Sequence, residues 1–391
     1  MILIKYFSRV LVFTASLAFC SCQAQVTEPP FIMTGAEQMD QYLPKLAGKS
    51  VALLINHTSL VNDTHLLDTL LSSGVEVVKI FAPEHGFRGD LANGEQVDDG
   101  FDQKTGLPLI SLYGKNKKPT KEQLEGIDVV IYDIQDVGAR FYTYISSMHY
   151  MMEACGENGI SFLIFDRPNP NAHYVDGPVL EIEKASFVGI HPIPIVYGMT
   201  VGELALMIKG EGWIKQSETL DLQVIHLKNW TRDSSYILPV SPSPNLPNSQ
   251  AISLYPSLCL FEGTHVSMGR GTDFPFQAVG YPDPAFGAFE FTPRSIPGVS
   301  KYPPHKNKIC YGYDLRSVPQ PNRIDLSYLI QFYNQSNQKD DFFNAFFTNL
   351  AGTKTLREQI EDGWTEEEIR ASWESDLVAF ESKRKSYLIY K

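Results

Sequence analysis

The feature that most constrains the fold is an alternation of short apolar runs with amphipathic stretches across the first half of the chain. Apolar runs of strand length lie at 51–56, 75–81, 128–136, 160–166 and 220–227. They are continuous rather than alternating with polar residues, which is typical of strands buried on both faces of a parallel sheet. The sequence therefore predicts an α/β fold whose parallel strands are joined by right-handed crossovers.

Helical periodicity fills the intervals between these runs. The first expected helix begins at an N-cap on Asp63 or Thr64 and stops at Gly74, because capping residues precede its leucine face and a glycine follows it. The expected helices are 62–74, 143–155 and 200–212.

The pattern changes at the proline-rich stretch "LPVSPSPNLPNS", which starts at Leu238. Leucine and asparagine are interleaved with the prolines, so we expect an ordered crossing between two domains. A Rossmann-like domain over 25–240 and a smaller, mixed α+β domain over 241–391 are predicted. The tail of the second is expected to be helical, with a capping box of Thr365 and Glu368.

The first 24 residues have the character of an export signal. Lys5 and Arg9 precede an apolar stretch over 10–19, which is too short to span a membrane stably. Cleavage after Ala24 and lipid attachment at Cys22 both fit the residues that follow. Either alternative predicts an exported protein, periplasmic or anchored to the membrane as a lipoprotein.

Charge and cysteine content narrow the function. The formal net charge of −12 argues against nucleic acid as the main partner. Cys155, Cys259 and Cys310 remain after the signal, with no CxxC spacing, so a disulfide framework or zinc knuckle is not indicated. Buried free thiols are expected, with one disulfide left open, and no protein partner can be inferred.

Polar residues gather where each predicted strand ends. In an open parallel sheet these carboxyl ends form the ligand-binding edge, although Asp and Asn there also fix turns and caps. The glycines of "EHGFRG" suit a sharp turn after the second strand. The candidates lie at the end of a predicted strand or just beyond it: Asn56 for the first strand, Glu84, His85 and Arg88 for the second, Asp133, Gln135, Asp136 and Arg140 for the third, and Asp166, Arg167 and Asn169 for the fourth.

Several reaction classes lack their motifs. There is no glycine-rich dinucleotide fingerprint, no P-loop, no G-x-S-x-G elbow and no H-E-x-x-H, so no cofactor is expected. A metal site built from His85, Asp133, Asp166 and His265 stays open as an alternative, but their spacing does not demand a metal.

What remains is carboxylates beside aromatic residues. Glu84 is followed by Phe87, Tyr142 and Tyr144 belong to "RFYTY", and Glu262 follows an aromatic residue in the second half. Aromatic platforms stack on sugar faces, and a desolvated carboxyl keeps its proton near neutral pH, as a glycosidase requires. Four arginines are candidates for holding a carboxylate substituent of the sugar by bidentate hydrogen bonds. They are Arg88, Arg140, Arg167 and Arg270.

Eight segments carry a resemblance to a known family. They are "EHGFRG", "PLISLYG", "DVVIYDIQDVGARFYTY", "DRPNP", "DGPVL", "YGMTVGELA", "PSPNLP" and "YPSLCLFEGTHVSMGRGTDFPFQ". In this order they resemble the exo-β-N-acetylmuramidase family from about Gly48 onward. The resemblance implies a Rossmann-like domain, a smaller C-terminal domain, and a cleft between them that removes terminal N-acetylmuramic acid (MurNAc) from peptidoglycan fragments. The lactyl carboxylate of that sugar would give the arginines a ligand.

The family does not settle the catalytic pair, so those roles rest on chemistry. Glu84 is predicted to be the general acid, with Glu262 or Asp136 as its partner, and a substrate-assisted route through the N-acetyl group stays open. "PSPNLP" and "EGTHVSMGRG" are expected to close the cleft and to supply Asn245 and Thr264. The alternatives are a non-catalytic muropeptide-binding lipoprotein and a metal-dependent amidase or deacetylase.

Overall fold

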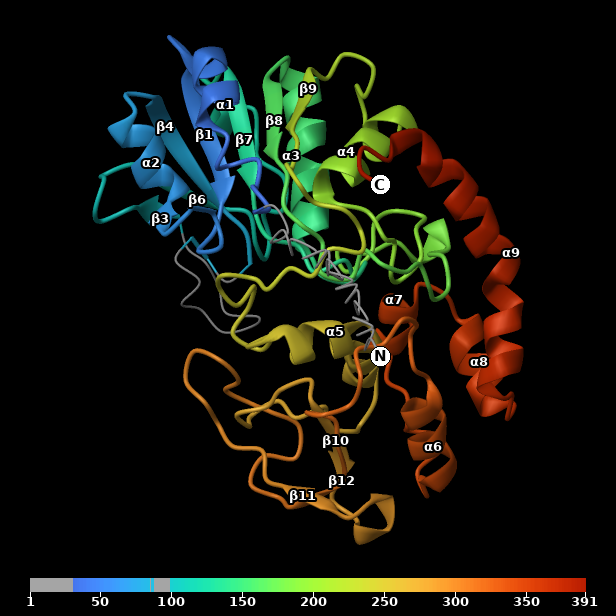
Figure 1. The fold of residues 1–391 in the computed structure, drawn as a ribbon. Coiled ribbons are helices and arrows are strands. Elements are labelled where there is room, and N and C mark those ends of the chain that lie inside the picture. The colour runs from blue at the N-terminus through green and yellow to red at the C-terminus, as the bar shows by residue number, and fades with distance from the viewer. Residues whose placement is uncertain (1–30, 85, 88–98) are drawn as a thin grey trace, which may run out of the picture. The chain divides into compact units, whose positions relative to one another are not determined.

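The first half of the chain builds one seven-stranded sheet. The computed structural model describes residues 31–84, 86–87 and 99–391 of the 391. The strand order is β5-β6-β4-β1-β7-β8-β9, and all neighbours are parallel except the edge pair β5–β6 (Figure 1). The strands are β1 (Ser50–Ile55), β4 (Glu76–Ala82), β5 (Gly100–Phe101), β6 (Pro108–Ser111), β7 (Val129–Asp133), β8 (Ser161–Phe165) and β9 (Leu222–Ile225). The predicted parallel α/β sheet is confirmed, with β5 and β6 added to it.

Both faces of the sheet are buried, as the continuous apolar runs predicted. Ala52 and Leu54 of β1 pack toward α3 (Tyr144–Asn158) and α4 (Val201–Gly210). Val51 and Leu53 belong to a second core cluster with α1 (Met39–Leu46) and α2 (Leu66–Ser72). Successive side chains of a strand point to opposite faces, so an apolar residue is needed at every position.

The predicted N-cap of the first helix is wrong. Leu60–Val61 (β2) and Thr64–His65 (β3) form a small antiparallel hairpin, with Asn62 at a φ of 51° in its turn. Asp63 and Thr64 are therefore in the hairpin, and His65 caps α2 by accepting a hydrogen bond from Leu67 N. The expected capping box of α9 (Glu366–Arg384) is present at Thr365 and Glu368.

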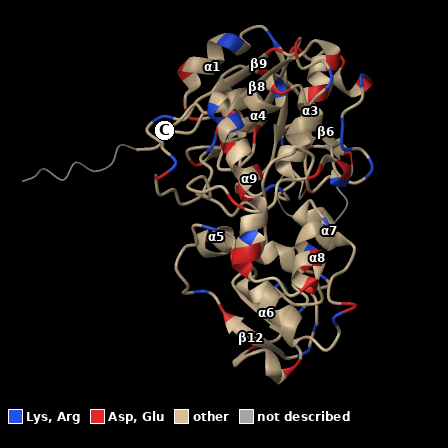
Figure 2. Cartoon of the chain, turned by 90° about the vertical axis from the view of Figure 1, so that its right-hand side faces the viewer, with Lys and Arg blue, Asp and Glu red and all other residues tan. Residues whose placement is uncertain are grey.

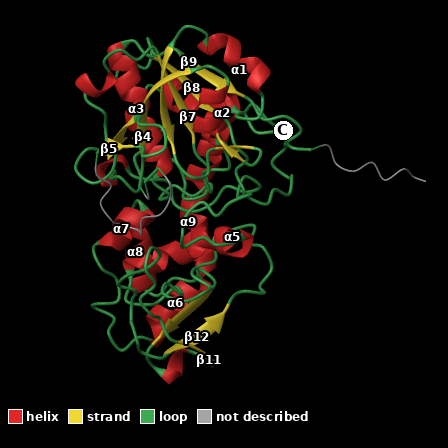
Figure 3. Ribbon diagram, turned by 90° about the vertical axis from the view of Figure 1, so that its left-hand side faces the viewer, coloured by secondary structure: helices red, strands yellow, loops and turns green. Residues whose placement is uncertain are grey.

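The second half is smaller and mixed, as predicted. Its antiparallel sheet has the order β10-β12-β11, and helices pack around it (Figure 3). The elements are α5 (Ser249–Leu258), η3 (Cys259–Gly263), β10 (Ala278–Tyr281), η4 (Pro284–Phe286), β11 (Phe289–Phe291), β12 (Cys310–Asp314), α6 (Ser327–Gln335), α7 (Phe346–Ala351), α8 (Thr355–Glu361), α9 and η5 (Lys385–Tyr387). The remaining single turns are η1 (Glu122–Leu124) and η2 (Ile182–Lys184).

The chain returns to the first half after α9. Figure 1 places the C-terminus beside α4, and Ile389 N and Tyr390 N donate to the carboxylate of Glu203 in that helix (2.8 and 3.1 Å). Residues 32–391 accordingly group as one unit. The predicted domain border at 240 stays a prediction.

Two further findings concern the described residues. Cys155, Cys259 and Cys310 are free and buried, as expected. None of the helices between residue 31 and the C-terminus has the length and apolar character needed to cross a bilayer.

Candidate active site

A pocket of about 340 Å³ is lined by side chains from both halves of the chain. The first half contributes Glu84 and the loop that leads into α3, and the second contributes α5, η3 and α7. The volume lies in the range of sites for small ligands. Six predicted site residues line this pocket: Glu84, Tyr142, Tyr144, Asn245, Glu262 and Arg270.

Glu84 is held at the pocket by its surroundings. It follows β4 directly, and Gly86, at a φ of 75°, turns the chain just after it. Its Oε2 accepts a hydrogen bond from Thr143 Oγ1 at 2.9 Å. Burial, and then the charge of Glu84, raise the pKa values of the Tyr113 and Tyr144 phenols, so both phenols stay protonated beside the carboxylate.

Glu262 faces the same pocket but is paired. The Nε and Nη2 atoms of Arg270 both donate to its Oε1, the first at 3.0 Å. Arg270 also lies 5.0 Å from the centre of the Phe276 ring. The pairing raises the pKa of Arg270 against the opposing effect of its burial. Glu262 thus lies in the pocket and at the same time forms a salt bridge with Arg270.

The walls between the two carboxylates are aromatic. Tyr142 packs edge-on against Tyr144 and Tyr255, with ring centroids 4.9 and 5.9 Å apart, and Tyr255 packs edge-on against Phe276 at 5.0 Å. The Tyr142 hydroxyl donates to the Pro242 carbonyl at 2.8 Å, which fixes that ring. Such a surface suits the apolar face of a sugar.

The proline-rich crossing reaches the pocket through Asn245. Its Nδ2 donates to the Val299 carbonyl at 2.9 Å, and its buried Oδ1 has no hydrogen-bond partner among the described residues. Thr264 does not line the pocket. Its hydroxyl donates to the Phe261 carbonyl and accepts from Val266 N, which closes the turn after η3.

The amides at the strand ends lie inside the protein instead of lining the pocket. Asn56 is fully buried and its Oδ1 accepts from the backbone N–H and hydroxyl of Thr58. Gln135 donates to the Pro168 carbonyl at 2.7 Å, and Asn169 donates to the main chain just before α4 at 2.8 Å. These amides tie neighbouring loops together at the ligand-binding edge of the sheet.

The aspartates at the strand ends are also internal. Asp133 forms a buried ion pair with Arg167 through both carboxylate oxygens. Asp136 accepts hydrogen bonds from Tyr197 Oη and Gly138 N, yet burial raises its pKa to about 6. Neither Asp136 nor Arg167 lines the pocket.

Asp166 has the same character. It accepts from Thr200 Oγ1 and Tyr390 Oη, both at 2.7 Å, and from Gly202 N at 2.9 Å. Burial raises its pKa to about 6 as well. It joins β8, the start of α4 and the returning C-terminal segment.

Among the predicted arginines that the structure describes, Arg140 is the most deeply buried. Its Nη1 donates to the carbonyls of Pro178 and Ile193 (2.8 and 2.7 Å), and its Nη2 to those of Leu350 and Ala351 (3.0 and 2.7 Å). Burial lowers its pKa to about 9. Arg140 therefore lies between the first half and the end of α7, where four backbone carbonyls occupy its Nη atoms, and it is not among the residues that line the pocket. His85 and Arg88 lie outside the described residues.

Several pocket residues were missed by the sequence analysis. Tyr113 follows β6, a strand that was not expected because it is short and begins with a proline. Thr143 had a signal, since it stands within "RFYTY" between two predicted residues. Phe187, Tyr255 and Phe276 lie in segments whose fold the local pattern left undefined.

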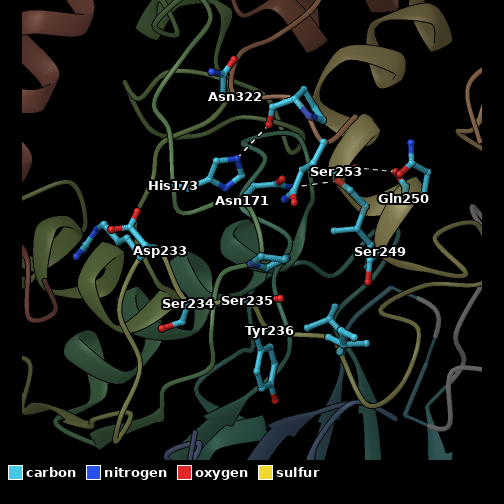
Figure 4. A pocket seen from close by; sticks show the side chains of 17 residues that line it. Asn171, His173, Asp233, Ser234, Ser235, Tyr236, Ser249, Gln250, Ser253 and Asn322 are labelled. Carbon is cyan, nitrogen blue, oxygen red and sulfur yellow. Dashed lines mark hydrogen bonds between the residues drawn. The ribbon is translucent and has the colours of Figure 1, made fainter. Parts of the chain in front are cut away.

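A second pocket, of about 520 Å³, has different chemistry (Figure 4). Its lining includes Asn171, His173 and a run of residues around Tyr236, with Asp233 as its one carboxylate. His173 is hydrogen-bonded to the Pro321 carbonyl at 3.0 Å. None of the predicted site residues lines it, so the carboxylate pocket is the candidate active site.

Metal ligands do not gather in the part of the chain that the structure describes. No group of three or more His, Cys, Asp or Glu side chains there could hold a metal ion. Of the four residues considered for such a site, Asp133 is paired with Arg167, and His85 lies outside the described residues.

Fold and pocket together define a class of protein. It is an α/β protein with a mostly parallel sheet in its first half, and its second half completes an aromatic pocket that bears two carboxylates. Family models described as "Exo-beta-N-acetylmuramidase NamZ" match residues 51–250 (N-terminal) and 253–390 (C-terminal). The chain belongs to the NamZ exo-β-N-acetylmuramidase family.

Individual relatives agree with this assignment. The chain is 39% identical over 402 residues to the peptidoglycan β-N-acetylmuramidase NamZ of Bacillus subtilis strain 168, covering 96% of each protein. Crystal structures of two DUF1343 family proteins from Bacteroides fragilis NCTC 9343 are similar, with TM-scores of 0.86 and 0.80 at 49% and 30% identity. Each match covers 92% of this chain and 99% of the other.

Proposed function

We propose that this protein is an exo-acting glycosidase that releases MurNAc from the non-reducing end of peptidoglycan fragments. The observation that carries the proposal is the placement of Glu84 and Glu262, from two halves of a NamZ-family chain, in one aromatic pocket. Most glycosidases use two such carboxyl groups, which flank the scissile bond.

Glu84 is the proposed general acid. Its carboxyl protonates the glycosidic oxygen as the bond to the sugar breaks, and Thr143 holds it in place during that step. Glu262 is its proposed partner, since it lines the same pocket and Arg270 donates hydrogen bonds to its Oε1 and not to its Oε2. It then either activates a water or orients the N-acetyl group of the substrate.

The test is release of free MurNAc from a MurNAc–GlcNAc (N-acetylglucosamine) disaccharide by the purified protein. We expect turnover by the wild type and a kcat at least about 10²-fold lower for Glu84→Gln. Tight binding of the disaccharide without cleavage would instead favour a muropeptide-binding protein. Chelator-sensitive release of acetate from the disaccharide would favour a metal-dependent deacetylase, and chelator-sensitive release of the peptide from a peptide-bearing muramic substrate would favour an amidase.

We also propose that the protein is exported, either as a periplasmic protein or as a lipoprotein. The support is the basic and apolar order of residues 1–24 and the cysteine at position 22. Cell fractionation tests export, and labelling with a fatty-acid analogue, with Cys22→Ser as the control, tests the lipid anchor.

A further inference from the structure

A basic loop, residues 293–309, stands out in an acidic protein. Both signs of charge are interspersed over the face in Figure 2, and the net charge of the chain is −12. Between Glu290 and Asp314, however, there is no acidic residue. The same stretch carries four exposed cations, none of which forms an ion pair with another described residue: Arg294, Lys301, Lys306 and Lys308.

The basic loop is fastened to the wall of the carboxylate pocket. Val299 O accepts the hydrogen bond of the pocket residue Asn245 (2.9 Å), and Arg294 N donates to Gly271 O, next to Arg270, at 2.7 Å. An internal bridge between Ile296 and Ser300 closes its tip. Two exposed cations therefore lie close in sequence to these hydrogen bonds: Arg294 forms one of them itself, and Lys301 follows Val299 by two residues.

The pocket itself has little positive charge left for a ligand. Among its described lining residues the one cation is Arg270, which Glu262 neutralises. Arg140, behind the pocket, uses its Nη atoms on four carbonyls. Among the described residues, positive charge without an ion pair beside the pocket is found on the basic loop and at Lys117, whose ammonium lies 4.4 Å from the centre of the Phe187 ring.

The basic loop also presents an aromatic face to solvent. The Tyr302 side chain is 80% exposed, and the ammonium of Lys301 lies 5.6 Å from its ring centre. An exposed ring beside a cation matches a sugar that carries a carboxylate, because the ring stacks on the sugar and the cation pairs with the acid.

We infer that the basic loop is a second binding site, which holds a carboxylate-bearing sugar of the glycan strand beyond the residue in the pocket. This inference rests on the proposed function, since in peptide-free peptidoglycan each muramic residue of the strand carries a lactyl carboxylate. With one sugar in the pocket, the next carboxylate along the strand meets Arg294 and Lys301. Strands longer than a disaccharide are therefore the preferred substrates.

The experiment compares MurNAc release from the disaccharide and from longer peptide-free strands. The double variant Arg294→Gln, Lys301→Gln is expected to lose about threefold to tenfold in kcat/KM on long strands and little on the disaccharide. The preference of the wild type for long strands should shrink at high salt, where exposed charges are screened. The double variant Arg294→Lys, Lys301→Arg keeps both positive charges and should retain the preference for long strands.

The matched control is Lys228→Gln with Lys385→Gln, which removes two exposed cations elsewhere and should leave both substrates unaffected. Equal losses on both substrates, or no loss on either, would overturn the inference. Binding of long strands, measured against strands whose carboxyl groups have been reduced to alcohols, tests the loop without catalysis. If the wild type cleaves nothing but the loop variant still binds carboxylated strands more weakly, the proposed function fails and the site stands.

Discussion

Replacement of Arg140 tests most directly how the two halves are joined. Its guanidinium is fully buried and supplies four N–H groups to four backbone carbonyls, two of them at the end of α7. In Arg140→Lys a compact ammonium replaces the planar fork and reaches one of the two carbonyl pairs, so we expect the other two carbonyls to lose their donor. A buried acceptor without a partner costs about 1–3 kcal/mol, which gives a loss of about 3 kcal/mol for the variant.

This loss converts into a measurable shift of the melting temperature. Unfolding entropy of about 2.1 cal/mol/K per residue over 391 residues amounts to about 0.8 kcal/mol/K, so Tm should fall by about 4 °C. Differential scanning calorimetry measures the shift. The control is Arg357→Lys, at an arginine in an exposed pair with Glu361, which should change Tm by less than about 1 °C. An unchanged Tm for Arg140→Lys, with a selective loss of activity on muramic substrates, would show that Arg140 binds the substrate after all.

Four further outcomes are expected. Glu84→Gln should lower kcat by at least about 10²-fold with Tm unchanged, and a normal kcat would exclude Glu84 as the general acid. Glu262→Gln should lower kcat on a comparable scale, and full activity would assign Glu262 to the salt bridge alone. Burial raises the folded-state pKa of Asp136 from 3.8 to about 6, so the folded chain holds that proton more tightly than the unfolded chain does. The free energy of unfolding should therefore decline as pH rises from about 4 to about 6. Denaturant titrations over this pH range should show a smaller decline for Asp136→Asn. Tyr390→Phe removes the hydrogen bond to Asp166 and should cost about 1–2 kcal/mol of unfolding free energy, whereas Tyr302→Phe, at an exposed ring, should cost nothing measurable.

The sheet was predictable because its information is local. Almost every position of a strand buried on both faces is apolar, so β1 and β7 are recognisable within five or six residues. The elements that the sequence analysis missed also have local causes. The hairpin before α2 places Asp63 in a turn, and β6 is a four-residue strand that begins with a proline.

The site was only half predictable from polar residues at strand ends. Glu84 and Asp136 have the same local signature, an acid just after an apolar run. What separates them is distant in sequence, since Tyr197 covers Asp136 while Thr143 supports Glu84 at the pocket. Pairings 59 or more positions apart leave no periodic trace, so a single sequence does not distinguish a cleft acid from an internal one.

The return of the chain to α4 has a consequence for the order of folding. Glu203 is completely buried, and besides its nearer partners Thr200 and Arg232 it accepts hydrogen bonds from two N–H groups that lie 186 and 187 positions later in the chain. At about 5–20 residues per second a ribosome needs about 10–40 s to make that interval. Until then the Glu203 carboxylate lacks these two hydrogen bonds, so the packing around α4 can be completed only after the second half has been synthesised.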